Sequence, residues 1–167
     1  LIKNKNKNSG CVIANLQTKG RGTYGKKWVS KKGNLFSSIF FQLKENYPSY
    51  DEFSIINPVL ISNIIKKYYN QINISLKLPN DLFVNKKKVC GILQELITLK
   101  SKKFLIIGIG LNISSSPVIQ NKYEATNILA ETKKNTDIKK IFSFLVSGYE
   151  SFFDNLESYN YTYFKKK

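Results

Sequence analysis

Three apolar, β-prone runs separated by very short polar turns constrain this chain more than any other feature. The runs are residues 81–84, 88–99 and 104–113, and the turns are Asn85 to Lys87 and Ser101 to Lys103. Turns this short connect neighbouring antiparallel strands, because a parallel connection needs a crossover of about a dozen residues or more. The pattern therefore predicts a sheet built from hairpins, with residues 104–113 as a central strand.

Three further runs are typical of strands, namely residues 11–16, 34–43 and 73–79. A helix is expected at about 53–70, where the residues that share one apolar face are Ile56, Leu60, Ile64 and Ile65. A last helix is expected over 138–157, with Asp137 as its N-cap and an apolar face made of Ile138, Ile141, Phe142, Leu145 and Phe152. Residues 114–136 are polar and irregular. These elements predict an α/β fold of the α+β type, a largely antiparallel mixed sheet with helices packed on one face.

The length of 167 residues fits one domain. No run approaches the roughly 18 apolar residues of a membrane span, and the N-terminus lacks the pattern of a secretory signal. We therefore expect a cytoplasmic protein with no membrane partner. Methionine is absent, so we interpret residues 1–167 as an N-terminally truncated excerpt.

The net charge of +16 raises the question of nucleic-acid or membrane-surface binding. The lysines are scattered along the chain, however, and accompany abundant asparagine, isoleucine and tyrosine. This distribution favours a compositional origin, as in a protein from an AT-rich genome, over a nucleic-acid site. A basic surface could still attract an acidic protein substrate.

Cysteine and histidine chemistry is largely excluded. Cys11 and Cys90 are the only cysteines and there is no histidine, so a disulfide framework and a Cys/His metal site are not expected. Catalytic triads and Cys–His pairs need the missing histidine. Any chemistry must run on lysine, arginine, carboxylates, amides and the backbone.

The segment from Gly20 to Trp28 is the first candidate site. Its glycines, Gly20, Gly22 and Gly25, allow the backbone to approach a ligand closely and point N–H groups at an anion. Arg21 is the only arginine among 27 basic residues, which indicates a need for a planar, forked donor. Trp28 is the only tryptophan and could wall an apolar ligand. The spacing matches neither the P-loop nor the dinucleotide fingerprint.

Two more segments carry candidate residues. Asp81 and Lys88 lie on opposite arms of one hairpin and can approach each other, so that Lys88 could face phosphates while Asp81 orients it or helps to hold Mg²⁺. Gly108 and Gly110 interrupt an apolar strand, which often marks close approach of a ligand. Asn112 follows with an amide that can pair with an adenine edge. Each segment taken alone also fits an ordinary turn or a packed glycine.

Together these segments resemble the biotin protein ligase family. The family pattern is Gly-Arg-Gly-Arg-x-Gly-Arg-x-Trp, Lys-Trp-Pro-Asn-Asp, Lys-x-x-Gly-Ile-Leu-x-Glu and Gly-x-Gly-x-Asn, and the chain follows it in order from Gly20 to Asn112. Gln17 stands where the family has a biotin-contacting glutamine, and residues 124–128 resemble a later family segment. The resemblance covers residues 10 to 157.

The resemblance implies a fold related to class II tRNA synthetases and two half-reactions. Biotin and MgATP would give biotinyl-5′-AMP, and an acceptor lysine of a biotin carboxyl carrier protein would then take the biotin. ATP, Mg²⁺ and biotin are the implied ligands, and a homodimer is left open. The implied catalytic residues are Lys88, Asp81 and Arg21, with Asp81 also the candidate for Mg²⁺. The implied biotin and adenylate contacts are Gln17, Gly20, Arg21, Gly22, Thr23, Gly25, Trp28, Lys88, Gly91, Gly108, Gly110 and Asn112.

The chain departs from the family pattern at several positions. Thr23 replaces the second arginine, which binds the phosphate, and Lys26 and Leu78 replace an arginine and a tryptophan. The biotin-binding Ser-Thr-Asn segment is expected upstream of residue 1, and the small C-terminal barrel is expected to be absent. The alternatives are a lipoate or octanoate ligase or transferase of the same fold, a basic nucleic-acid-binding module, and a degraded ligase that binds without catalysing.

Overall fold

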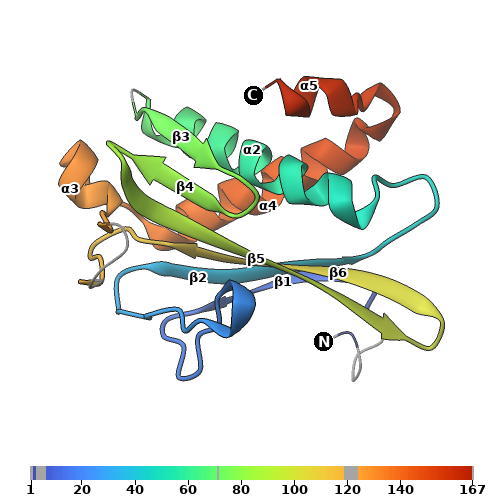
Figure 1. The fold of residues 1–167 in the computed structure, drawn as a ribbon, viewed down its shortest axis with the longest axis horizontal. Helices are drawn as coiled ribbons and strands as arrows, with labels where there is room; N and C mark the ends of the chain where they lie inside the picture. Colours follow the sequence, from blue (N-terminus) through green and yellow to red (C-terminus); the bar gives the residue numbers. More distant parts are fainter. Residues whose placement is uncertain (1, 3–6, 71, 119–123, 167) are drawn as a thin grey trace.

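The computed structural model of the chain describes residues 2, 7–70, 72–118 and 124–166. Its centre is a sheet whose strands, in the described part of the chain, run in the order β1-β2-β6-β5-β4-β3 (Figure 1). The bounds are β1 Ser9–Ala14, β2 Leu35–Gln42, β3 Ile74–Lys77, β4 Asp81–Val84, β5 Lys87–Leu99 and β6 Lys102–Leu111. All pairings between these strands are antiparallel, and the two predicted hairpins, β4–β5 and β5–β6, are confirmed.

Two long helices, α2 (Tyr50–Tyr69) and α4 (Ile138–Asp154), lie together on one face of the sheet (Figure 1). Their apolar residues pack on the strands, and those with no exposed surface are Phe53, Ile56, Ile61, Ile65, Ile141 and Leu145. The predicted fold class is therefore confirmed. No helix in the described ranges is both long and apolar enough to cross a membrane.

Alternation along the strands gives the sheet two different faces. On β6, Leu105, Ile107 and Ile109 belong to the core beneath the helices. Gly108 and Gly110 point the other way, toward the loop between β1 and β2, which carries the short helix η1 (Thr23–Gly25) (Figure 1). One face is thus filled by helices, and the opposite face remains open to a ligand.

The helix boundaries differ from the sequence-based expectation. Helix α2 begins three residues earlier than predicted, because Ser49 and Glu52 form a capping box ahead of it. Helix α4 begins as predicted, with the Asp137 carboxylate accepting from Lys139 N and Lys140 N, but it ends at Asp154. Residue-level periodicity does not resolve such ends, because capping depends on a few specific hydrogen bonds.

The stretch 114–136, expected to be irregular, contains helix α3 (Ile128–Thr132). Asn127 caps this helix by accepting from Ala130 N, and Ile128 is fully buried. Residues 119–123 of that stretch lie outside the described residues. After α4 come η2 (Leu156–Ser158) and α5 (Tyr161–Lys165). Both are too short to show a reliable periodic pattern of apolar residues in the sequence.

Candidate functional site

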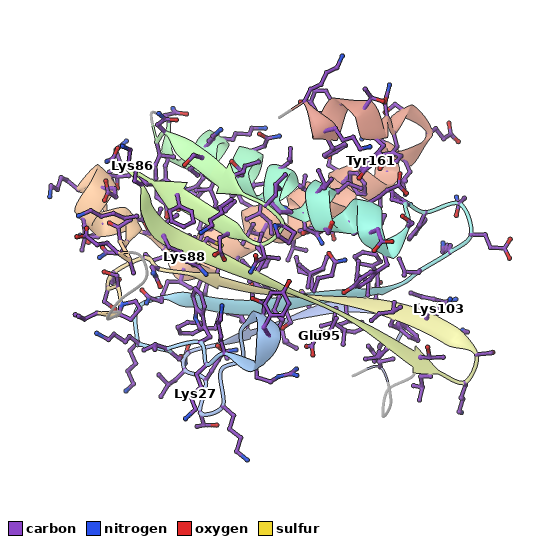
Figure 2. The ribbon with its side chains drawn as sticks, viewed as in Figure 1. Lys27, Lys86, Lys88, Glu95, Lys103 and Tyr161 are labelled. Atoms are coloured by element: carbon purple, nitrogen blue, oxygen red, sulfur yellow. The ribbon has the colours of Figure 1, made fainter. Side chains whose placement is uncertain are left out.

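An open cavity of about 360 Å³ lies between the β1–β2 loop and the strand face that the helices leave free. The strands contribute a floor that includes Ser38, Gly91, Leu93, Gly108 and Gly110. The loop contributes the opposite wall. Figure 2 shows Lys88 and Glu95 on the central strands, with Lys27 on the loop beneath them.

The loop wall is a tight turn held by its own backbone. Gly22 N donates to Lys26 O at 2.7 Å, and Trp28 N donates to Gly20 O at 3.0 Å. At the tip, Tyr24 and Gly25 have φ values of 54° and 71°, a left-handed conformation that glycine adopts at little cost. The glycine spacing seen in the sequence therefore builds a closed turn, and Gly25 itself points into open space.

Trp28 lies flat against the strand floor. A Cβ atom on Gly91 would stand 2.5 Å from Trp28 Cζ3, and one on Gly110 would stand 2.5 Å from Trp28 Cε2. Both distances are shorter than any real Cβ contact, so only glycine leaves room for the indole at these positions. Trp28 Nε1 is buried and has no hydrogen-bond partner among the described residues.

Lys88 and Asp81 meet at the inner end of the cavity. Lys88 Nζ lies 2.5 Å from Asp81 Oδ1, and the two side chains are only 11% and 13% exposed. The ammonium also lies 5.5 Å from the centroid of the Trp28 ring, which stabilises a cation. This confirms that the two arms of the hairpin bring these side chains together.

A β-bulge decides where Lys88 points. The β4–β5 register shifts between Leu82 and Phe83, so that Leu82 faces Cys90 but Phe83 faces Lys88. Val89 is the extra residue, and both Val89 and Cys90 pack in the core under the helices. The bulge returns Lys88 to the face of Gly91, toward the cavity.

Two further contacts fasten the loop to the strands. Arg21 Nη2 donates to Glu95 Oε2 at 2.7 Å. Asn80 Nδ2 donates to the Thr23 hydroxyl oxygen at 3.3 Å. Thr23 thus connects the loop to the turn between β3 and β4, a contact that the sequence did not suggest.

The structure brings together most of the residues predicted from the sequence. Those that line the cavity are Gln17, Arg21, Gly22, Thr23, Trp28, Asp81, Lys88, Gly91, Gly108 and Gly110. Gly20, Gly25 and Asn112 are not among the lining residues. Asn80 and Glu95 also line the cavity, but the sequence analysis gave them no role. Asn80 could have been found because it directly precedes Asp81. Glu95 could have been found because alternation along a strand places it on the same face as Gly91.

Asn112 is 2% exposed and lies just beyond β6. Its Nδ2 donates to Thr126 O at 3.1 Å, and its Oδ1 is buried without a hydrogen-bond partner in the described part of the chain. The Nδ2 group of Asn112 must face Thr126 O, because a carbonyl oxygen can only accept a hydrogen bond, and Oδ1 therefore points the other way. Asn112 therefore offers a free acceptor, which a ligand could reach only if neighbouring side chains moved.

The cavity is strongly cationic. Its basic lining residues are Lys19, Arg21, Lys26, Lys27, Lys77 and Lys88, against the carboxylates of Asp81 and Glu95. An anionic ligand is favoured in such a site. Cys90 is close to Lys88 but is not a nucleophile, because burial raises the pKa of its thiol to about 12 and keeps it protonated.

Comparison with known proteins assigns the family. Residues 2–112 match the Biotin/lipoate A/B protein ligase family. The chain belongs to this family. The bifunctional ligase/repressor BirA of Escherichia coli strain K12 is 31% identical over 110 residues, which are 65% of this chain and 34% of that protein. The chain therefore spans about a third of the length of this relative.

Two other relatives extend the likeness toward the C-terminus. The chloroplastic biotin–protein ligase 1 of Arabidopsis thaliana is 29% identical over 154 residues, 85% of this chain and 40% of that protein. The structure of the biotin protein ligase from Aquifex aeolicus in complex with biotin and ATP superposes with a TM-score of 0.80 at 30% identity. That superposition covers 99% of this chain and 69% of the other, so the family fold extends beyond residue 112.

Proposed function

We propose that the chain is the catalytic domain of an ATP-dependent biotin protein ligase. The observation that carries this proposal is the buried Lys88 ammonium beside Asp81, at the end of a cationic cavity walled by Trp28. The family also includes lipoate ligases, but the relatives near 30% identity are named as biotin ligases. The Aquifex relative was solved with biotin and ATP bound.

In the first half-reaction, a carboxylate oxygen of biotin attacks the α-phosphorus of ATP, and pyrophosphate leaves. Lys88 neutralises the negative charge that builds up between the carboxylate and the phosphate in the transition state. Asp81 holds the Lys88 ammonium in place through the 2.5 Å contact. In the second half-reaction, the neutral amine of an acceptor lysine on a biotin carboxyl carrier protein attacks the acyl carbon, and AMP leaves.

The remaining residues shape the binding site. Gly91 and Gly110 leave space for the Trp28 indole, which presents a flat apolar surface to the ligand. The free Oδ1 of Asn112 is a suitable acceptor for the exocyclic amine of adenine, once its surroundings open. Arg21 and Gln17 remain the proposed biotin contacts, and the ion pair with Glu95 holds Arg21 at the rim.

Mg²⁺ would enter as part of the MgATP substrate. The described residues contain no cluster of three or more metal-binding side chains, so an all-protein magnesium site does not fit. A site with one carboxylate plus substrate phosphates does fit the usual coordination of this ion. Asp81 is the candidate carboxylate, although its Oδ1 already contacts the Lys88 ammonium.

The direct test is ATP–pyrophosphate exchange with biotin, and in parallel with lipoate. Biotin-dependent exchange is expected, followed by transfer to a carrier protein. Exchange with lipoate alone would replace the substrate assignment and leave the family assignment intact. Salt-sensitive nucleic-acid binding without any exchange would favour the alternative of a basic binding module.

Thr23 motivates a prediction about retention of the adenylate. Its neutral hydroxyl contacts Asn80 and supplies no charge to a phosphate, whereas an arginine would make charge-assisted hydrogen bonds of roughly 1.5–3 kcal/mol each. Thr23→Arg should therefore slow dissociation of preformed biotinyl-5′-AMP several-fold. The measurement is the dissociation rate from native protein and from the variant.

The alternative is that a neighbouring lysine already supplies this charge. Lys26 and Lys27 both line the cavity, and a flexible ammonium fits a phosphate less rigidly than a guanidinium. If native protein retained the adenylate tightly, unchanged by Thr23→Arg, and lost it only in a Lys26→Ala, Lys27→Ala double variant, these lysines would supply the charge and the prediction for Thr23→Arg would be wrong.

A further inference from the structure

The backbone of Lys88 is held by a segment that lies far along the chain. Lys88 N donates to Glu124 O at 2.8 Å, and Thr126 N donates to Lys88 O at 2.8 Å. Together they form an isolated parallel bridge between Lys88 and Ala125. Because β6 ends at Leu111, this segment completes the sheet beside Lys88.

The segment is itself anchored on helix α3. Thr126 is 4% exposed, and its hydroxyl donates to Glu131 Oε1 at 2.5 Å. The second oxygen, Glu131 Oε2, accepts from Asn85 Nδ2 at 2.6 Å. The Glu131 carboxylate thus joins two segments that flank Lys88: Thr126, whose backbone pairs with Lys88, and Asn85 in the β4–β5 turn that precedes it.

A carboxylate suits this double role. An ionised glutamate only accepts hydrogen bonds and has two oxygens, so it can serve a hydroxyl and an amide at the same time. Hydrogen bonds to a charged acceptor are also about twice as strong as neutral ones. Glu131 does not line the cavity, so its contacts point to support of the site and not to ligand binding.

We propose that Glu131 is a positioning residue that fixes Lys88 through Thr126 and Asn85. The inference rests on the proposed function, because it concerns the ammonium that would stabilise the transition state. A displacement of a reacting group by about 1 Å can cost on the order of 100-fold in rate. Releasing both flanks of Lys88 should therefore lower the rate of adenylate formation and leave substrate affinity nearly intact.

The test compares pyrophosphate exchange in native protein, Glu131→Ala and Glu131→Gln. Alanine should lower kcat by about 10- to 100-fold while KM for biotin and ATP changes little. Glutamine should restore most of the loss, because its oxygen can accept from Asn85 and its amide can donate to the Thr126 hydroxyl. Glu150→Ala, at an exposed position on α4, is the matched control and should behave as native.

A second measurement does not depend on catalysis. Hydrogen exchange at the amides of Lys88 and Thr126 should become faster in Glu131→Ala and stay slow in Glu131→Gln and Glu150→Ala. If native protein is active, and Glu131→Ala changes neither kcat nor the rate of amide hydrogen exchange, the positioning role is overturned. A loss of activity in Glu131→Ala that merely matched the fraction of unfolded protein would also overturn it. A native protein without pyrophosphate exchange would instead remove the proposed function.

Discussion

Replacing Lys88 with alanine should slow adenylate formation by about 100-fold or more, corresponding to roughly 3 kcal/mol of lost transition-state stabilisation. The reason is that Lys88 presents a buried ammonium to the cavity, where charge interactions are weakly screened. The measurement is biotin-dependent pyrophosphate exchange at saturating substrates.

Matched lysines make the prediction specific. Lys86 lies at the tip of the β4–β5 turn with φ of 64°, and Lys87 pairs with Glu124 at an exposed position. Figure 2 shows Lys86 at the far end of the hairpin from Glu95. Alanine at either position should change the rate little. Equal losses at all three positions would instead point to a general effect of hairpin charge.

Stability must be separated from catalysis in this experiment. Lys88→Ala leaves the Asp81 carboxylate, 13% exposed, without its cation, and an unpaired buried charge destabilises a fold. The double variant Lys88→Ala, Asp81→Asn removes that charge and should recover thermal stability without recovering exchange activity. Recovery of both would show that Lys88 acts only through the fold.

Gly110→Ala should displace Trp28 and weaken ligand binding by more than about 10-fold. The added Cβ would lie 2.5 Å from Trp28 Cε2, and overpacking of this kind costs about 1–3 kcal/mol or forces the indole to move. Trp28 is the only tryptophan in the sequence, so its fluorescence reports its position directly. A red-shifted emission is expected as the indole moves into water.

Gly108→Ala is the matched control for the position of Trp28. Gly108 lies on the same strand and the same face, but an added Cβ would meet Leu93 at an ordinary 3.6 Å. The emission of Trp28 should therefore stay as in native protein. Calorimetric titration with ATP and biotin gives the affinities. Native emission together with native affinity in Gly110→Ala would contradict the close packing of Trp28 on β6.

The sequence alone was sufficient to predict the six strands, the two long helices α2 and α4, and the order in which they follow one another. Turns of three residues or fewer leave an antiparallel neighbour as the geometric solution, so the β4–β5–β6 meander followed from spacing. The period-2 alternation of any strand also separates Gly108 and Gly110 from Ile107 and Ile109, which pack in the core. These are local properties, and local pattern is sufficient to predict them.

Only the tertiary structure decided how the site is assembled. Strict alternation would place Lys88 on the face of Cys90 and Ile92, inside the core. The bulge at Val89 reverses this, and no single-sequence pattern marks it, because it depends on the pairing of β5 with β4. The same holds for Thr126 and Glu131, whose contacts with Lys88 and Asn85 join segments about 40 residues apart. Hydrogen bonds at such separations exist only once the chain has folded, so their partners cannot be read from local spacing.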